Sequence, residues 1–283
     1  MKTLLLDAGN SRLKWALCEH GELSQQGNID YEWSRQAAQL DATFTALAVA
    51  TGPLDGVLLC NVAGNKLDIV LREQLAKHWL PTGKSAVNRV QETTSLTIEN
   101  VIAQADAFGV RSAYQQPAQL GADRWVGLVA ARQHCVGLTC IIDCGTALTV
   151  DVLTAEGVHA GGIIVPGMEM MIASLIENTD GIAGSGRAEV SPLAVTNTAD
   201  AVQAGVLAAM RGAVQQVLQH CRDELGEEPA CVLTGGNGER LLSALPSATI
   251  YDPDWVFKGL VIIAAGDARQ AVNQSVNTGN QIR

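Results

Sequence analysis

Two short stretches that lie 136 residues apart share one pattern, and this repeat constrains the fold more than any other feature of the sequence. Leu4 to Ser11 reads LLLDAGNS, and Cys140 to Ala147 reads CIIDCGTA. Each is the pattern of a buried strand that ends in Asp-x-Gly and leads into a second strand. The offset, 143 − 7 = 136, is close to half of the 283 residues. Duplication explains this match better than chance, so we expect two similar lobes that face each other across a cleft.

Hydrophobic periodicity predicts an α/β chain in which the two halves follow a similar order. In the first half, strands are expected at Thr3–Asp7, Leu13–Cys18, Glu22–Ile29 and Gly56–Val62, and helices at Trp33–Ala50, Lys66–Trp79 and Val101–Tyr114. In the second half, strands are expected at Thr139–Asp143, Leu148–Leu153, Val158–Val165 and Ala230–Thr234, and helices at Asp123–Cys135, Thr198–Leu225 and around Trp255–Val272. A break at Pro166-Gly167 leads into the segment Met168–Ile176. The predicted lobes are residues 1–118 and 119–283.

Charge and composition exclude several classes of function. The formal net charge is −10, which disfavours a nucleic-acid-binding surface. The longest apolar run, Leu260 to Ala265, is far shorter than the ~20 residues of a membrane helix, and the three leucines near the N-terminus are too few for a signal-peptide core. The seven cysteines show no CxxC spacing. We therefore expect buried, reduced thiols and a cytoplasmic location, with no membrane partner.

An Asp-x-Gly turn between two strands can handle phosphate. Glycine lets backbone N–H groups approach phosphate oxygens without interference from a Cβ atom, and the carboxylate can hold Mg²⁺ directly or through water. Turns at Asp7 and Asp143, one from each lobe, could grip the β- and γ-phosphates of a nucleotide from both sides. Either turn alone could equally be an ordinary hairpin with a capping Asp.

A third pattern is the apolar run at Val232 that leads into the glycines Gly235, Gly236 and Gly238. A buried strand that ends in such a turn offers a flat surface without side chains, against which an adenine or ribose could lie. Glycines also end strands for local reasons, so the pattern gains its weight from following the two Asp-x-Gly turns.

The ordered set of three patterns resembles the acetate kinase, sugar kinase, Hsp70 and actin superfamily. Within it, the sequence resembles the type III pantothenate kinases, also called the Bvg accessory factor family. The motifs that carry this resemblance are DAGNSRLKWAL at 7–17, Tyr114-x-x-Pro117 leading to GADRW at 121–125, DCGTALTVD at 143–151, GGIIVPG at 161–167 and NTADAVQAG at 197–205. The resemblance implies a duplicated ribonuclease H-like (actin-like ATPase) fold, with mixed sheets around a central cleft, and ATP-dependent phosphorylation of pantothenate to 4′-phosphopantothenate.

The resemblance also implies residue roles and cofactors. The cofactors would be Mg-ATP and a monovalent cation (K⁺ or NH₄⁺) held by Asp143. ATP would be bound by Thr146 and by the first loop, which comprises Asp7, Ala8, Gly9, Asn10, Ser11, Arg12, Leu13 and Lys14, with Asp7 near Mg²⁺. The general base would be Asp123. Pantothenate would be bound by Tyr114, Gly121, Ala122, Asp123, Arg124 and Thr198, in a homodimer with the pocket near the interface.

Other interpretations of these residues stay open at the level of sequence. Asp123 could be a helix N-cap, since Asp is favoured there and a helix is expected beside it. Arg124 could be a surface ion-pair residue. The protein could also phosphorylate another small alcohol or carboxylate, or act as a non-enzymatic regulatory accessory protein. The motif at Gly121–Arg124 argues against the former, and the presence of all three aspartates argues against the latter.

Overall fold

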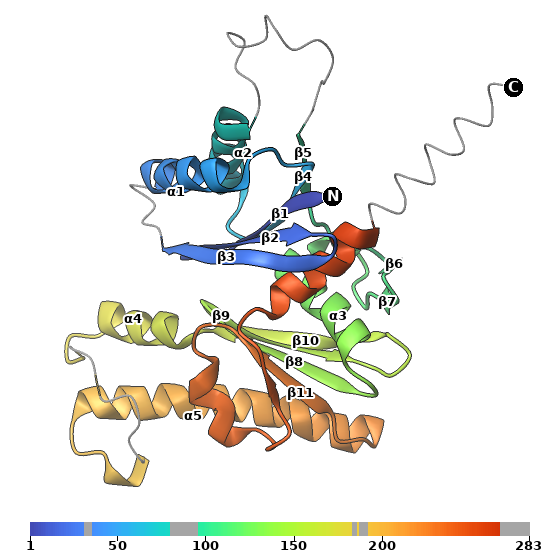
Figure 1. Ribbon diagram of the computed structural model, residues 1–283. Helices are drawn as coiled ribbons and strands as arrows, with labels where there is room; N and C mark the ends of the chain where they lie inside the picture. The colour runs from blue at the N-terminus through green and yellow to red at the C-terminus, as the bar shows by residue number, and fades with distance from the viewer. Residues whose placement is uncertain (31–35, 80–95, 183–185, 187–191, 267–283) are drawn as a thin grey trace, which may run out of the picture. The chain divides into compact units, whose positions relative to one another are not determined.

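The first Asp-x-Gly strand lies at the centre of a mixed sheet. In the computed structural model, which describes residues 1–30, 36–79, 96–182, 186 and 192–266, β1 (Lys2–Ala8) pairs antiparallel with β2 (Arg12–Glu19) and parallel with β4 (Gly56–Asn61). The edge strands β3 (Glu22–Asp30) and β5 (Thr97–Asn100) complete the order β3-β2-β1-β4-β5. The helices α1 (Gln36–Thr51) and α2 (Asn65–Trp79) cover one face of this sheet (Figure 1).

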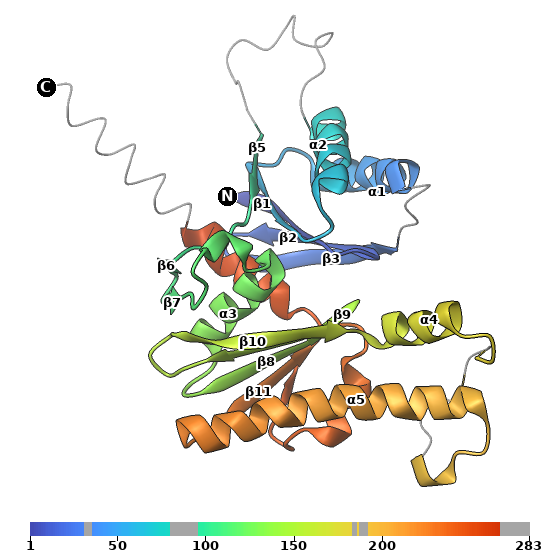
Figure 2. The same ribbon diagram turned by 180° about the vertical axis from the view of Figure 1, so that it is seen from behind.

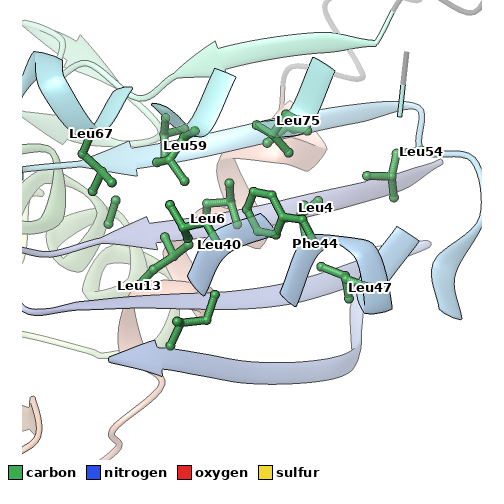
Figure 3. Packing of buried hydrophobic residues seen from close by; sticks show 14 of the residues in the cluster. Leu4, Leu6, Leu13, Leu40, Phe44, Leu47, Leu54, Leu59, Leu67 and Leu75 are labelled. Atoms are coloured by element: carbon green, nitrogen blue, oxygen red, sulfur yellow. The ribbon is translucent and has the colours of Figure 1, made fainter. Parts of the chain in front are cut away.

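Alternation along β1 decides which side chains enter the core. Leu4 and Leu6 are fully buried and pack with Phe44 of α1 and Leu67 of α2 (Figure 3). Burial of one such side chain stabilises the fold by roughly 1.5–3 kcal/mol relative to an exposed one. Because successive side chains in a strand point to opposite faces, Asp7 lies on the face away from α1 and α2.

The second Asp-x-Gly strand lies at the same position in a second sheet. The strands β8 (Thr139–Cys144), β9 (Ala147–Leu153), β10 (His159–Pro166), β11 (Ala230–Thr234) and β12 (Ile250–Tyr251) have the order β10-β9-β8-β11-β12. β8 pairs antiparallel with β9 and parallel with β11, as β1 does with β2 and β4. The long helix α5 (Thr198–His220) packs on one face of this sheet (Figure 2). The predicted duplication of an α/β unit is confirmed.

The chain divides into two compact units, each of which is built from more than one segment of the sequence. One comprises residues 1–103, 118–130 and 256–283, and the other comprises 104–117 and 131–255. The helix α3 (Ala122–His134) therefore contributes to both units. Residues 255–266 form a helix that lies in the first unit from residue 256 onward. Its Gly259 packs so closely on Val126 of α3 that a Cβ atom there would lie 2.2 Å from the Val126 carbonyl oxygen. The domain boundary at residue 118 stays a prediction.

One predicted helix is wrong. The segment Val101–Tyr114 contains no helix; it contains a small hairpin of β6 (Asp106–Ala107) and β7 (Val110–Arg111). Phe108 and Gly109 both have positive φ (54° and 77°), which suits a tight hairpin turn and not a helix. Arg111 also bridges to Val158 and donates its N–H to the Gly157 carbonyl oxygen, so contacts distant in sequence override the local helical spacing.

Shorter elements and the ends of some predicted helices complete the description. The remaining helical segments are η2 (Pro117–Gln119), α4 (Met168–Asn178), η3 (Pro192–Ala194), η4 (Cys221–Leu225) and η5 (Gly238–Ala244). The predicted start of the Trp33–Ala50 helix and the end of the Trp255–Val272 helix fall outside the described residues. Among the residues that are described, no helix has both the length and the hydropathy needed to cross a membrane.

Candidate active-site residues

Asp7 is a partly buried carboxylate next to two other charged groups. Lys14 lies directly opposite it on β2, so both side chains extend from the same face of the sheet. Burial raises the pKa of Asp7 from its usual 3.8 to about 6; the Lys14 ammonium lowers the pKa in part, and the negative charge of Asp123 raises it. A carboxylate with this pKa gains from any cation that approaches it, which suits a position beside Mg²⁺ and phosphate.

The turn after Asp7 has the form expected for a phosphate loop. The Gly9 N–H donates to the Arg12 carbonyl oxygen (3.0 Å) and closes a turn whose Asn10 and Ser11 are exposed. Ala8 and Leu13 are fully buried in the core, so only their backbone groups could face a ligand. The Arg12 guanidinium pairs with Asp30 on β3.

The first turn of α3 carries the Gly-x-Asp-Arg motif. The helix begins at Ala122, and its first backbone bond runs from the Trp125 N–H to the Gly121 carbonyl oxygen. Asp123 therefore lies inside the first turn, and the interpretation of this residue as an N-cap is wrong. Its Oδ1 accepts the N–H of Arg124 at 2.7 Å, and a Cβ atom on Gly121 would lie 2.7 Å from the same oxygen. Glycine at 121 thus leaves room for the carboxylate.

Arg124 is only 7% exposed, so its interpretation as a surface ion-pair residue is also wrong. Ala122 beside it is buried as well. The planar guanidinium of Arg124 is of the kind that binds carboxylate and phosphate groups through two parallel hydrogen bonds.

Asp143 occupies the same register in the second sheet as Asp7 does in the first. The Gly145 N–H donates to the Ala147 carbonyl oxygen (3.0 Å), as Gly9 does to Arg12. Asp143 is partly buried, and Thr146 at the tip of the turn is exposed. This second turn is one residue shorter than the first, since β8 ends at Cys144 and β9 starts at Ala147.

Two further glycines close around the second turn. A Cβ atom on Gly167 would lie 2.4 Å from the Thr146 carbonyl oxygen, and one on Gly235 would lie 2.5 Å from Asp143 Oδ1. The turn after β11 is anchored by the Asn237 N–H, which donates to the Cys144 carbonyl oxygen at 3.0 Å. Gly167 and Gly235 are both buried, so they let the neighbouring strands pack closely around the Asp143 carboxylate.

Sequence reasoning missed the residues that brace this corner. The Asn237 amide donates to both carboxylate oxygens of Glu169 (2.9 and 3.2 Å), and an Arg240 guanidinium N–H lies 2.9 Å from the Met168 sulfur. These contacts tie the start of α4 to the turn after β11. The Pro166-Gly167 step was visible in the sequence, but it indicated only a break between elements.

Tyr114 and Thr198 belong to the second unit, as does Asp143. Tyr114 is partly buried, and its ring stacks on that of His159 with a centroid distance of 5.9 Å. Thr198 is the exposed first residue of α5, just after the N-cap Asn197, whose side chain accepts the Asp200 N–H.

The cysteines take no part in this chemistry. All seven are free thiols, and six of them are buried. Burial and the nearby Asp143 and Glu169 charges raise the pKa of Cys144 to about 12, against a lowering effect of Arg240. The thiol beside the candidate site therefore stays protonated and is a poor nucleophile.

Metal binding would rest on single carboxylates. Within the described part of the chain, no three His, Cys, Asp or Glu side chains are grouped so that they could hold a metal ion. Mg²⁺ in kinases commonly keeps several waters and takes one or two carboxylates together with substrate phosphates. Asp7 and Asp143 fit that mode.

Comparison with known proteins agrees with this chemistry. The model of the type III pantothenate kinase family matches residues 3–220. A type III pantothenate kinase of Nitrosococcus oceani is 34% identical over 266 residues, which cover 92% of this chain and 93% of the relative. Another, of Thiobacillus denitrificans, is 37% identical over 270 residues, with 94% and 98% covered.

Solved structures agree on the fold. A conserved Campylobacter jejuni protein assigned to the Baf family of transcriptional activators has a TM-score of 0.57 at 19% identity, with 93% of this chain and 99% of that one covered. A 2-dehydro-3-deoxygalactonokinase-type protein of Sinorhizobium meliloti has a TM-score of 0.54 at 15% identity, with 94% and 98% covered. At these identities the likeness concerns the fold alone.

Proposed function

The chain belongs to the type III pantothenate kinase family, and from that premise we propose how its residues divide the work of the reaction. The activity is the ATP-dependent phosphorylation of pantothenate, the first step toward coenzyme A. Phosphoryl transfer depends on in-line positioning and on neutralised phosphate charge more than on covalent catalysis. The assignments below therefore concern positioning, charge and one proton.

Asp123 is the general base in this proposal. As the oxygen of the 4′-hydroxyl forms its bond to the γ-phosphorus, the bond from that phosphorus to the β–γ bridging oxygen breaks, and ADP departs with the electron pair. The hydroxyl proton passes to the Asp123 carboxylate. Support comes from the location of this carboxylate in the first turn of α3, where Gly121 leaves space around it and its charge reaches Asp7.

The two hairpin turns bind the triphosphate. Residues 7–14 form the first phosphate loop, in which the Lys14 ammonium would face phosphate oxygens and the Asp7 carboxylate would hold Mg²⁺. Asp143 would hold a monovalent cation, and the Thr146 hydroxyl would contact ATP. When bound, these cations neutralise charge on the β- and γ-phosphates. The matched register of Asp7 and Asp143 in the two sheets supports the assignment.

Pantothenate is bound by Tyr114, the turn Gly121–Arg124 and Thr198. The buried Arg124 guanidinium is placed to bind the carboxylate of the substrate, with the bidentate geometry that such pairs prefer. Tyr114 offers a half-buried ring that can cover the apolar part of the molecule.

The functional form is a homodimer in the cytoplasm. Support comes from α4, of which only Met168 is buried, while Met170 is 48% exposed and Ile164, on the preceding strand β10, is 61% exposed. Leu175 and Ile176 are exposed on the same helix. An apolar helix of this kind is typical of a surface that a second copy of the chain covers. Sedimentation of the purified protein tests this: a monomer at micromolar concentration contradicts it.

The family match over residues 3–220 carries the assignment, and an ADP-release assay tests it. With Mg-ATP and K⁺ present, pantothenate should give turnover, whereas acetate and hexoses should give none above background. Turnover with another acceptor in place of pantothenate would favour a different kinase. Release of ADP with no acceptor would favour a nucleotide-driven accessory protein.

A further inference from the structure

Asp151 and His159 form a buried polar pair that the mechanism above does not use. The His159 Nε2 atom lies 2.8 Å from Asp151 Oδ1, and the two side chains are 0% and 3% exposed. The residues sit on the neighbouring strands β9 and β10, where the pairing shifts register between His159 and Gly161. His159 pairs with Leu153, which lies two residues from Asp151 on β9, so His159 and Asp151 lie on the same face of the sheet.

The pair lies on the same face of the second sheet as Asp143. Val150 and Val152 pack into the two apolar clusters that contain residues of α5 and its C-terminal extension, so Asp151 between them points to the opposite face. The same alternation sends Asp143 away from α5, because Ile142 and Cys144 on either side of it face that helix. Asp151 is therefore on the side of the sheet that carries the candidate phosphate corner.

The hydrogen bond fixes the state of the imidazole. An ionised carboxylate only accepts hydrogen bonds, so the proton between the two side chains must be on His159 Nε2. In the neutral ring, Nδ1 is then an acceptor. This atom is buried, and no hydrogen-bond partner for it is found among the described residues. A buried polar atom without a partner is unfavourable for folding alone, which indicates that the pair is kept for another reason.

The aromatic ring of Tyr114, which lies next to the pair, suggests that reason. The His159 ring is stacked under the ring of Tyr114, with the two planes inclined by 18°. Ser112 holds the backbone of Tyr114 through an Oγ atom 3.2 Å from its N–H. A ring that is held by a buried carboxylate has little freedom to turn, so the aromatic ring stacked on it is held in one plane as well.

We propose that Asp151 and His159 are positioning residues for the substrate pocket: Asp151 fixes the plane and tautomer of His159, and His159 in turn fixes the orientation of Tyr114. The proposal rests on the proposed function of Tyr114 as a pantothenate-binding residue. Neither member of the pair needs to touch the substrate. Their effect on the reaction should therefore vanish when the Tyr114 ring is absent.

The first test needs no substrate. In protein labelled with ¹⁵N-histidine, His159 should show a protonated Nε2 and a bare Nδ1, and Asp151→Asn should give a mixture of tautomers, because an amide can either donate or accept. The Tyr114 ring resonances should shift in the same variant. Retention of a single tautomer together with unchanged Tyr114 resonances would overturn the proposal.

The second test is a kinetic double-mutant cycle. Asp151→Asn should raise KM for pantothenate by about tenfold while KM for ATP changes by less than about twofold, and in a Tyr114→Ala background it should add nothing. Equal effects of Asp151→Asn with and without the Tyr114 ring would show a general structural role and contradict the proposal.

A matched control is available in the first unit. Asp41 Oδ1 and His78 Nε2 also lie 2.8 Å apart, but Asp41 is on the surface. Asp41→Asn should leave both KM values unchanged.

If Asp151→Asn does not fold, His159→Gln tests the same claim, because it keeps a hydrogen-bond donor for Asp151 and removes only the ring. An unchanged KM for pantothenate in that variant would refute the positioning role. If the wild-type protein does not phosphorylate pantothenate, the proposed function fails. The NMR measurements would still test whether Asp151 and His159 orient the Tyr114 ring.

Discussion

The Asp143 carboxylate fills the space that a side chain on Gly235 would need. A Cβ atom at 235 would lie 2.5 Å from Asp143 Oδ1 and 2.5 Å from the Cys144 backbone, and Gly235 has a φ of +88°. The strand β11, which pairs in parallel with β8, is thus followed by the one residue type that leaves room for the Asp143 carboxylate. The position of the Asp143 carboxylate therefore requires glycine at residue 235.

Gly235→Ala should therefore disturb both stability and nucleotide binding. Backbone strain and the clash with Asp143 should together lower the free energy of unfolding by about 2–4 kcal/mol, and the displaced carboxylate should weaken ATP binding. Gly226→Ala is the control, since Gly226 has a similar φ (+72°) but open space around it; it should cost about 1–2 kcal/mol and leave ATP binding unchanged. Urea unfolding and ATP titration measure the two effects. Equal losses in both variants would rule out the clash.

Asp123→Asn should separate chemistry from folding. The amide oxygen can still accept the Arg124 N–H, so the free energy of unfolding should change by less than about 0.5 kcal/mol. Loss of the general base should lower kcat by about 10²–10⁴-fold. Asp180→Asn, at an exposed position, is the control and should keep full activity. Turnover near that of the wild type in Asp123→Asn would remove this residue from the mechanism.

The raised pKa of Asp7 predicts a pH-dependent stability. Because its pKa is about 6 in the folded protein and near 3.8 in the unfolded chain, the folded state binds the proton more tightly. Its contribution to stability is complete below pH ~3.8 and is lost as the pH rises through ~6. At neutral pH, Asp7→Asn should therefore stabilise the ligand-free protein by on the order of 1–2 kcal/mol, after allowance for partial solvent screening and for Lys14 losing its counter-charge.

Urea unfolding at pH values from about 4 to about 8 measures this effect of Asp7→Asn. The difference from wild type should be small near pH ~4 and grow toward neutrality. The variant should also lose activity, because the carboxylate beside Mg²⁺ is gone. A difference that does not depend on pH would show that Asp7 titrates normally in the folded protein.

Replacement of K⁺ by Na⁺ should lower turnover if Asp143 holds a monovalent cation. A loss of about tenfold corresponds to ~1.4 kcal/mol of transition-state stabilisation. Asp143→Ala should abolish the difference between the two cations while lowering activity in both. Activity that is indifferent to the cation in the wild-type protein would contradict the site.

Local pattern was sufficient for the two central hairpins and for the glycine-rich turn after β11. The apolar runs at residues 4–6 and 140–142 are continuous, as expected of strands that are buried on both faces, and each leads directly to an aspartate. Hydrophobic periodicity likewise predicted a helix that begins at Asp123, although the structure was needed to show that α3 begins one residue earlier and that Asp123 is not its N-cap.

Features that depend on distant contacts could not be predicted in this way. The hairpin at Phe108 is held by Arg132, whose guanidinium donates to the Gly109 and Ala155 carbonyl oxygens. The hydrogen bond between Asp151 and His159 joins two neighbouring strands, and the bond from Asn237 to Glu169 spans 68 residues. A sequence read in short windows does not contain these relationships.

The close packing of Gly259 on α3 has a consequence for the history of the duplicated chain. The first half does not end where its repeat ends: its unit is completed by helical segments that the chain supplies only after residue 118 and again near its C-terminus. A fragment that stops at residue 118 would lack α3 and the helix at residues 255–266, so it should be less stable than the whole chain. An ancestor of half the present length would thus have needed a second copy of the chain to supply those helices, and fusion of the two copies would have placed them in one polypeptide.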